Sequence, residues 1–473
     1  MRRVKIRRSL SDIRNLEGTN LQLSQYLNIM EREDVACLFH SLSLGKLFVD
    51  KTTLQDLRRL FDGKRVFQND LIDEPLRQSI KYMYEHFMIV GDGDDDLTSR
   101  MAPKALYDDL GIRLMYLVVS EGCNLACKYC FIERNYEPQI KKTSMTEETA
   151  EMAVNYFSDI LDRSAKSKQI IFYGGEPLLN FPAIQAAIRK IHQLQENGSL
   201  QKDTVVSLLT NGTLLSESVA RYLYENGVEV GISIDGPAKN HDAMRMYPDG
   251  KGSFAAVWEG IQNAKKIYGN SIGFSVVPGP HNLDELPKIM EWLITDVGCD
   301  KVGISLPTHP FYFEPEQIAQ KIFESFMVIK KYGLGEDRIV RVLRPLISEN
   351  IYPSDCGAIG GQIIVASDGS LGVCHGFLGS RQFFGNNLAS LSERKIHPMQ
   401  LNEWQEWSTR SPLVALKQHC QECLALGLCG GGCGLNAYYR TGSIFGMDEA
   451  FCRYVKTMLG LLLWYLYDKG KDG

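Results

Sequence analysis

Three cysteines on one short loop constrain this chain most. Residues 123–130 read CNLACKYC, so Cys123, Cys127 and Cys130 have CX3CX2C spacing. The apolar run 114–119 just before them predicts a strand that ends at this loop. Three thiolates can hold three corners of a 4Fe-4S cluster and leave one iron open for chemistry. A zinc knuckle is the alternative, but structural zinc takes four ligands and no fourth Cys or His lies nearby in the sequence.

Composition limits the classes of function. The 473 residues are 44% apolar, which is enough for two or three domains with their own cores. A net charge of −5 gives no basic field, so we expect no nucleic-acid partner. The longest late apolar run, 458–466, is too short to cross a bilayer, so we expect a soluble, cytoplasmic protein with no membrane partner. Twelve cysteines without a secretory signal are better interpreted as metal ligands than as disulfides.

The middle of the chain, residues 113–335, alternates strand and helix patterns. This rhythm predicts an α/β fold with a parallel sheet and right-handed crossovers. Six such units predict a partial (β/α)6 barrel of the TIM-like kind, with its site at the carboxyl ends of the strands. The predicted strands are 114–119, 169–173, 204–209, 228–234, 272–277 and 301–306.

The helix after the cysteine loop has a recognisable beginning. Ser144 and Glu147 have the spacing of a capping box, in which the two side chains satisfy backbone amides of the first turn. Apolar residues then recur at helical spacing through Leu161. We therefore expect a helix that starts at Ser144.

The first 112 residues have a different pattern. Short antiparallel strands are expected over 26–30 and within 35–49, helices over 53–61 and 75–87, and a last strand near 88–90. This order predicts a small α+β module of the winged-helix kind. The acidic, glycine-containing stretch 91–96 resembles a linker.

Polar residues and glycines follow the later strands of the predicted barrel. Paired glycines after the second strand permit close backbone approach to a ligand, and an arginine can pair with a carboxylate. Each of these short motifs taken alone is also an ordinary turn. The residues are Gly174, Gly175, Glu176, Asn211, Ser233, Asp235 and Arg245.

Taken together, these motifs resemble the signature of radical S-adenosylmethionine (SAM) enzymes. In that family the open iron of the cluster chelates SAM, and reductive cleavage yields a 5′-deoxyadenosyl radical that takes hydrogen from an unactivated C–H bond. The resemblance implies that Tyr129 fills the aromatic position before the last cysteine. It also implies that the seven residues after the strands, with Tyr129, bind SAM.

A second cysteine field lies in the C-terminal segment 336–473. It resembles the seven-cysteine signature of the SPASM domain, which holds two auxiliary 4Fe-4S clusters, so three clusters are expected in all. The family pairing assigns one cluster to Cys420, Cys423, Cys429 and Cys452, and the other to Cys356, Cys374 and Cys433. Two 4Fe-4S clusters contain eight irons, so these seven cysteines leave one iron without a cysteine ligand. A pair of zinc ribbons is the alternative for this segment.

Two features separate this chain from some relatives. Where sulfatase-maturing relatives place an acidic base, this chain has His375. His375 is either a catalytic base or a histidine packed beside a cluster. The N-terminal module stands where peptide-modifying relatives grip a precursor peptide by strand addition, and a capping domain for the barrel is the alternative.

These inferences predict a radical SAM oxidoreductase that matures a ribosomally made precursor peptide (a RiPP maturase). The expected product is a side-chain crosslink, with a thioether favoured because an open auxiliary iron could bind a peptide thiolate. The expected partners are the precursor peptide and an electron donor such as a reductase, flavodoxin or ferredoxin. Oxidation of a protein Ser or Cys, as in sulfatase maturation, is the enzymatic alternative. An iron–sulfur electron carrier is the alternative without catalysis.

Overall fold

A computed structural model describes residues 5–63, 65–68, 72–91, 94, 111–308 and 313–471. They form two compact units that do not follow chain order. One unit combines the described parts of 1–109 with 341–356 and 410–473, and the other combines those of 110–340 with 357–409. The predicted division into segments 1–112, 113–335 and 336–473 remains a proposal about function. The segment 336–473 is split between the two compact units.

The larger unit is built on a nine-stranded mixed sheet with the order β12-β11-β10-β9-β8-β7-β13-β14-β15. Strands β7 to β12 are parallel and adjacent in chain order, and all six lie where the sequence predicted strands. The strands are β7 (Leu114–Ser120), β8 (Gln169–Gly174), β9 (Val205–Thr210), β10 (Val228–Ser233), β11 (Gly273–Val276), β12 (Lys301–Ile304), β13 (Gln362–Val365), β14 (Ser370–Gly372) and β15 (Asn386–Asn387). The expected α/β fold with a central parallel sheet is confirmed. Its closure into a (β/α)6 barrel remains a prediction.

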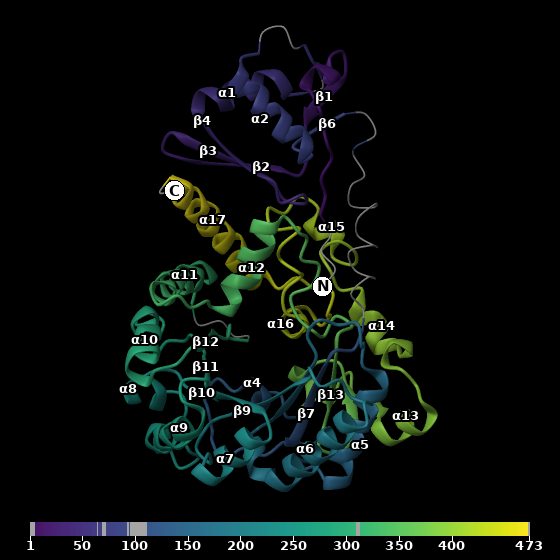
Figure 1. The fold of residues 1–473 in the computed structure, drawn as a ribbon, viewed down its shortest axis with the longest axis vertical. Helices are drawn as coiled ribbons and strands as arrows, with labels where there is room; N and C mark the ends of the chain where they lie inside the picture. Colours follow the sequence, from purple (N-terminus) through teal and green to yellow (C-terminus); the bar gives the residue numbers. More distant parts are fainter. Residues whose placement is uncertain are drawn as a thin grey trace. The chain divides into compact units, whose positions relative to one another are not determined.

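Helices cover one side of this sheet, along which α5, α6, α7 and α9 lie in Figure 1. The helices are α4 (Phe131–Arg134), α5 (Glu147–Ile160), α6 (Phe181–Glu196), α7 (Glu217–Glu225), α8 (Ala238–Asp242), α9 (Phe254–Tyr268), α10 (Leu286–Trp292), α11 (Pro315–Lys331), α13 (Leu388–Arg394) and α14 (Asn402–Ser408). The start of α5 corrects one prediction. Thr146, not Ser144, is the N-cap and accepts a hydrogen bond from the Thr149 amide, while Ser144 forms a β-bridge with Ser120.

The two faces of the parallel sheet differ in exposure. Leu117, Phe172 and Leu208 occupy one row of the register and are fully buried. The neighbouring row points to the opposite face, because side chains alternate along a strand. In that row Leu209 is 39% exposed and Tyr173 is half-buried. One face is therefore core, whereas the other, the open face, carries these partly exposed side chains beside buried ones such as Val118.

The smaller unit contains two three-stranded sheets, with the orders β5-β1-β6 and β2-β3-β4. The strands are β1 (Asn20–Leu23), β2 (Leu27–Arg32), β3 (Val35–His40), β4 (Lys46–Asp50), β5 (Arg65–Val66) and β6 (Ile89–Gly91), and the helices are α1 (Lys51–Phe61), α2 (Glu74–Glu85), α15 (Lys417–Cys420), α16 (Gly434–Thr441) and α17 (Glu449–Lys471). Helix α12 (Asp337–Ser348) passes from one unit into the other. The antiparallel strands and both helices predicted here are present. Most of the predicted linker 91–96 lies outside the described residues.

The C-terminal helix packs on the N-terminal sheet within this unit. Phe48 of β4 lies 5.0 Å from Tyr467 and 6.0 Å from Trp464, measured between ring centroids. Arg32 of β2 forms an ion pair with Asp468. A shared core also joins Ile6 and Leu42 to residues 351 and 413–426. The N-terminal module is therefore not an independent body.

Candidate functional site

The cysteine loop leaves β7 and is fastened to the segment that carries Arg245. The amide of Ala126 donates to the carbonyl of Met246 at 2.7 Å, and the amide of Lys128 donates to the carbonyl of Met244 at 2.9 Å. These two bonds fix the middle of the CX3CX2C loop. Burial raises the pKa of Cys127 to about 11, and the charge of the nearby Arg245 opposes this rise.

The two glycines after β8 hold the loop from another side. A Cβ on Gly174 would lie 2.0 Å from the carbonyl oxygen of Ser120, and a Cβ on Gly175 would lie 2.4 Å from that of Gly122. The amide of Gly175 donates to Ser120 at 2.9 Å. The close approach that the sequence predicted at these glycines is therefore made to the backbone of the cysteine loop itself.

Glu176 is fully buried, and its carboxylate is used inside the protein. It accepts hydrogen bonds from the Thr210 hydroxyl at 2.7 Å, the Asn211 amide at 2.7 Å and the Leu178 amide at 3.0 Å. Burial nevertheless raises the pKa of Glu176 to about 7. Its side chain ties the ends of β8 and β9 together.

Asn211 connects the end of β9 to the first cysteine. Its Nδ2 donates to Oδ1 of Asn124 at 2.9 Å and lies 3.8 Å from Sγ of Cys123. Ser233 ends β10, where it pairs in register with Ser275. Both lie at the carboxyl ends of parallel strands, as predicted.

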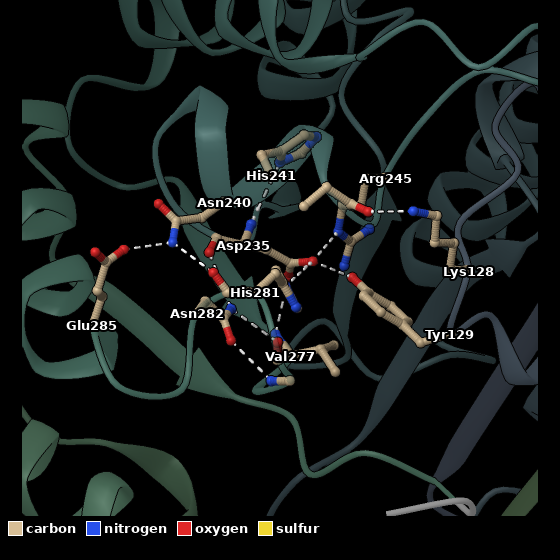
Figure 2. Close-up of polar contacts among 12 residues, drawn as sticks. Lys128, Tyr129, Asp235, Asn240, His241, Arg245, Val277, His281, Asn282 and Glu285 are labelled. Atoms are coloured by element: carbon tan, nitrogen blue, oxygen red, sulfur yellow. Dashed lines mark hydrogen bonds and ion pairs between the residues drawn. The ribbon is translucent and has the colours of Figure 1, made fainter. Parts of the chain in front are cut away.

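Asp235 is the centre of a buried polar network (Figure 2). Its Oδ2 accepts from the Tyr129 hydroxyl at 2.5 Å, from Nε of Arg245 at 3.1 Å and from Nε2 of His281 at 3.2 Å. Burial opposes ionisation, but Arg245 and the hydrogen bonds hold the pKa of Asp235 well below its usual range. Asp235 therefore positions Tyr129 and Arg245, and its carboxylate is not free for a ligand.

Sequence reasoning missed two members of this network. His281 and Asn282 follow β11, and Asn282 donates to the carbonyl of Asp235 at 3.1 Å. Nδ1 of His281 is buried without a hydrogen-bond partner. Asn211 and Asp235 were predicted because polar residues follow successive strands. The same signal is present in the PGPHN sequence of residues 278–282, which follows the predicted fifth strand.

A second buried network that the sequence did not reveal lies just before the cysteines. Glu121 is 1% exposed. Its Oε1 accepts from Arg381 at 2.6 Å and from Ser367 at 2.5 Å, and its Oε2 accepts from the Tyr136 hydroxyl at 2.6 Å. This carboxylate fastens the start of the cysteine loop to residues 367–381. No sequence motif predicts this network, because its residues are far apart in the chain.

His375 lies over the open face of the sheet. Its ring centroid is 4.9 Å from that of Tyr116, 5.1 Å from that of Tyr173 and 5.6 Å from that of Phe131, next to the third cysteine. Burial lowers the pKa of His375 to about 4, and its Nδ1 has no hydrogen-bond partner. The structure thus brings a neutral imidazole to the same end of the sheet as the cysteine loop.

The three cysteines of the loop fit a cluster ligand set. The thiols of Cys127 and Cys130 both act electrostatically on the thiol of Cys123. Backbone amides donate to sulfur at Cys123, from Leu125, and at Cys130, from Glu133. Among the residues placed in the structure, no three His, Cys, Asp or Glu side chains converge on one metal ion.

The C-terminal cysteines divide between the units. Cys420, Cys423, Cys429 and Cys452 lie in the smaller unit, and the charges of Cys423 and Cys452 act on both Cys420 and Cys429. Cys356 acts on Cys433 in the same unit. Cys374 follows β14 in the larger unit. The first predicted set is therefore gathered in one unit, whereas Cys374 lies in a different unit from the other two members of the second set.

Comparison with known proteins decides the class of the site. Residues 117–293, which contain the cysteine loop and the Asp235 network, match the model of the radical SAM superfamily. The chain carries a radical SAM domain. The family resemblance inferred from the motifs is thereby confirmed, and this family implies a 4Fe-4S cluster and SAM.

Two named relatives are similar to this chain over most of its length. It is 26% identical to the radical SAM cyclopropyl synthase TigE of Paramaledivibacter caminithermalis, over 95% of this chain and 97% of that protein. It is also 26% identical to a cysteine-type anaerobic sulfatase-maturating enzyme of Clostridium perfringens, over 68% of this chain and 88% of the relative.

Two solved structures share the fold of this chain. The native anSMEcpe structure with bound AdoMet has a TM-score of 0.62 at 21% identity and covers 76% of this chain and 99% of that one. Streptococcus suis SuiB bound to the precursor peptide SuiA has a TM-score of 0.51 at 14% identity, with coverage of 91% and 99%. Among the residues placed in the structure, no helix is long and apolar enough to cross a membrane.

Proposed function

We propose that this chain uses SAM to remove a hydrogen atom from a residue of a precursor peptide and closes a new bond within that peptide. The observation that carries the proposal is the geometry around Arg245. Its Nε is used by Asp235, and its position beside Cys127 leaves the terminal nitrogens for a ligand of the cluster loop. A guanidinium there fits the carboxylate of SAM.

The proposed binding residues follow from the same geometry. Cys123, Cys127 and Cys130 hold the cluster, and the backbone of Gly174 and Gly175 with Asn211, Ser233 and Arg245 contacts SAM. When bound, cluster and SAM supply a carbon-centred radical that abstracts hydrogen. Asp235 and Glu176 act indirectly, since their buried carboxylates orient Tyr129, Arg245 and the strand ends.

The peptide would lie on the open face of the parallel sheet. Leu209 and Tyr173 present partly exposed side chains there, and His375 adds an imidazole with a free Nδ1. His375 is our proposed base for the proton that leaves the peptide during bond formation. The N-terminal module would hold a distant part of the peptide by adding it as a strand to β2 or β4, the outer strands of their sheet.

Electron balance adds a second requirement. Closing a bond removes two hydrogens from the peptide, one as an atom and one as a proton, and one electron remains. That electron needs an acceptor, which the two sets of C-terminal cysteines would hold as auxiliary clusters. An external reductase, flavodoxin or ferredoxin would provide the electron for SAM cleavage.

Two bonds are candidates for the product. A thioether agrees with the missing eighth ligand, because an open iron can bind a cysteine thiolate of the peptide. A carbon–carbon bond that closes a cyclopropane is favoured by the similarity to TigE across almost the whole chain. Oxidation of a side chain as in sulfatase maturation is not favoured, because His375 replaces the acidic base. A simple electron carrier would not need the Arg245 site.

Mass spectrometry of a treated peptide tests the proposal. The reconstituted protein is incubated anaerobically with SAM, reductant and peptides encoded beside its gene. Loss of two hydrogens, with all cysteines still alkylatable and no aldehyde that reacts with a hydrazide, indicates a crosslink without sulfur, and fragment ions that join two residues through carbon identify a carbon–carbon bond. The same loss with one cysteine blocked indicates a thioether. A peptide of unchanged mass while SAM is consumed would contradict peptide modification.

A further inference from the structure

Arg410 is a buried cation in the C-terminal segment without a carboxylate partner. Its side chain is 0% exposed. Nε donates to the carbonyl of Ile444 at 2.6 Å, and Nη1 donates to the carbonyl of Gly432 at 2.9 Å. Nη2 is buried and has no hydrogen-bond partner. Two backbone carbonyls satisfy part of this guanidinium, and no described carboxylate forms an ion pair with it.

Burial of this partly satisfied guanidinium is unfavourable for the stability of the folded protein. A guanidinium keeps its charge at any ordinary pH. A buried charge is normally paired, because an ion that leaves water loses its hydration. Asp448 feels the charge of Arg410, but its carboxylate is occupied by the Cys433 amide, the Asn436 side chain and the Phe451 amide. A further negative charge nearby would offset the remaining cost.

Three cysteines of the C-terminal segment lie near enough to interact with this charge. Arg410 acts electrostatically on the thiols of Cys420, Cys452 and Cys433. The first two belong to one predicted set and the third to the other. Gly431, at φ 91°, allows the close approach, since a Cβ there would lie 3.2 Å from Nη1. The turn over 429–433 is thus shaped around the guanidinium.

We propose that Arg410 is the fixed counter-charge of the auxiliary clusters and raises their reduction potential. The inference rests on the proposed function, because it requires clusters at these cysteines. A thiolate-bound cluster is negative and becomes more negative when it is reduced. A buried positive charge therefore favours the reduced form, since net charge and hydrogen bonds set cluster potentials. Arg410 is a tuning residue and not a catalytic one.

The test isolates the auxiliary clusters. In a background with Cys123, Cys127 and Cys130 changed to Ala, Arg410→Met is compared with its parent by iron analysis and by redox titration monitored by electron paramagnetic resonance. At a fixed potential we expect about tenfold less reduced cluster in the variant, which is ~59 mV for a one-electron couple. Arg440→Met is the matched control, because Arg440 is partly exposed and paired with Glu449. We expect no change there, since solvent screens the charge.

Two further variants keep the test decisive. Arg410→Lys retains the charge and should stay within about threefold of the parent. If Arg410→Met loses iron, Arg410→Gln replaces it, since Gln keeps a donor for the Gly432 carbonyl. If Arg410→Met or Arg410→Gln keeps its full iron content and shows the same ratio of reduced to oxidised cluster as the parent, the proposed role of Arg410 is wrong. A parent background that binds zinc and no iron overturns the cluster assignment as well.

Discussion

Nε of Arg245 donates to Oδ2 of Asp235 at 3.1 Å, and both side chains are buried. The same oxygen accepts from the Tyr129 hydroxyl next to the third cysteine. One carboxylate therefore fixes an aromatic ring of the cysteine loop and a cation beside that loop. The site depends on this positioning as much as on the cysteines.

Asp235→Asn should damage both stability and SAM binding. The change leaves Arg245 buried without its counter-charge, and breaking such a pair costs about 3–5 kcal/mol. We expect SAM affinity to fall by at least about tenfold, since Arg245 loses its fixed position. Urea unfolding and calorimetric titration with SAM measure the two effects. Asp249→Asn is the control, because Asp249 is exposed and pairs locally with Lys251. Equal behaviour of the two variants would refute the role of Asp235.

Glu176 should make stability depend on pH. Its pKa is about 7 in the folded protein against 4.5 ordinarily, so the folded state binds more protons between these values. Stability contributed by this group therefore falls as pH rises from about 4.5 to about 7. Glu176→Gln lacks this titration. The thermal midpoint of the wild type minus that of Glu176→Gln should fall by at least about 2 °C between pH 5 and pH 7.5. A pH-independent difference would show that Glu176 does not titrate there.

Arg381→Met should loosen the cysteine loop. It leaves the Glu121 carboxylate buried with only hydroxyl partners, so we expect a loss of about 3 kcal/mol. The double variant Glu121→Gln/Arg381→Met should recover part of this loss, because no charge is then stranded. Urea unfolding of the four members of the cycle measures the coupling. Strictly additive effects would mean that the pair is not coupled.

Iron content tests the assignment of the cysteines. Three 4Fe-4S clusters predict about twelve irons per chain after anaerobic reconstitution. Changing Cys123, Cys127 and Cys130 to Ala should leave about eight irons, because the remaining sets use other residues. Metal analysis of both proteins gives the counts. About four irons with stoichiometric zinc in the wild type would contradict auxiliary clusters.

Local patterns in the sequence predicted the parallel sheet well. All six strands were found within a few residues, because each is an apolar run closed by turn residues. The helix start at Ser144 was wrong, since Thr146 satisfies the first-turn amide and Ser144 is used by a β-bridge. Local spacing alone did not separate these two hydroxyl residues.

Contacts between residues far apart in the chain could not be predicted from local sequence patterns. The contacts of Phe48 with Tyr467, and of Glu121 with Arg381, join residues hundreds of positions apart. They also change an experiment. Deletion of residues 1–105 would remove the proposed peptide-binding module, but it would also uncover Trp464 and Tyr467 on α17. Point changes in β2 and β4 are therefore better probes of peptide binding than the truncation.

Reductive cleavage of SAM is the most direct test of the central claim. The reconstituted protein is incubated anaerobically with SAM and dithionite, and 5′-deoxyadenosine is quantified by chromatography and mass spectrometry. We predict 5′-deoxyadenosine from the wild type, at a rate that rises when the peptide substrate is added, and none above background from the Cys123→Ala/Cys127→Ala/Cys130→Ala protein. Equal 5′-deoxyadenosine from both proteins, or none from wild type that holds its full iron, would contradict the account.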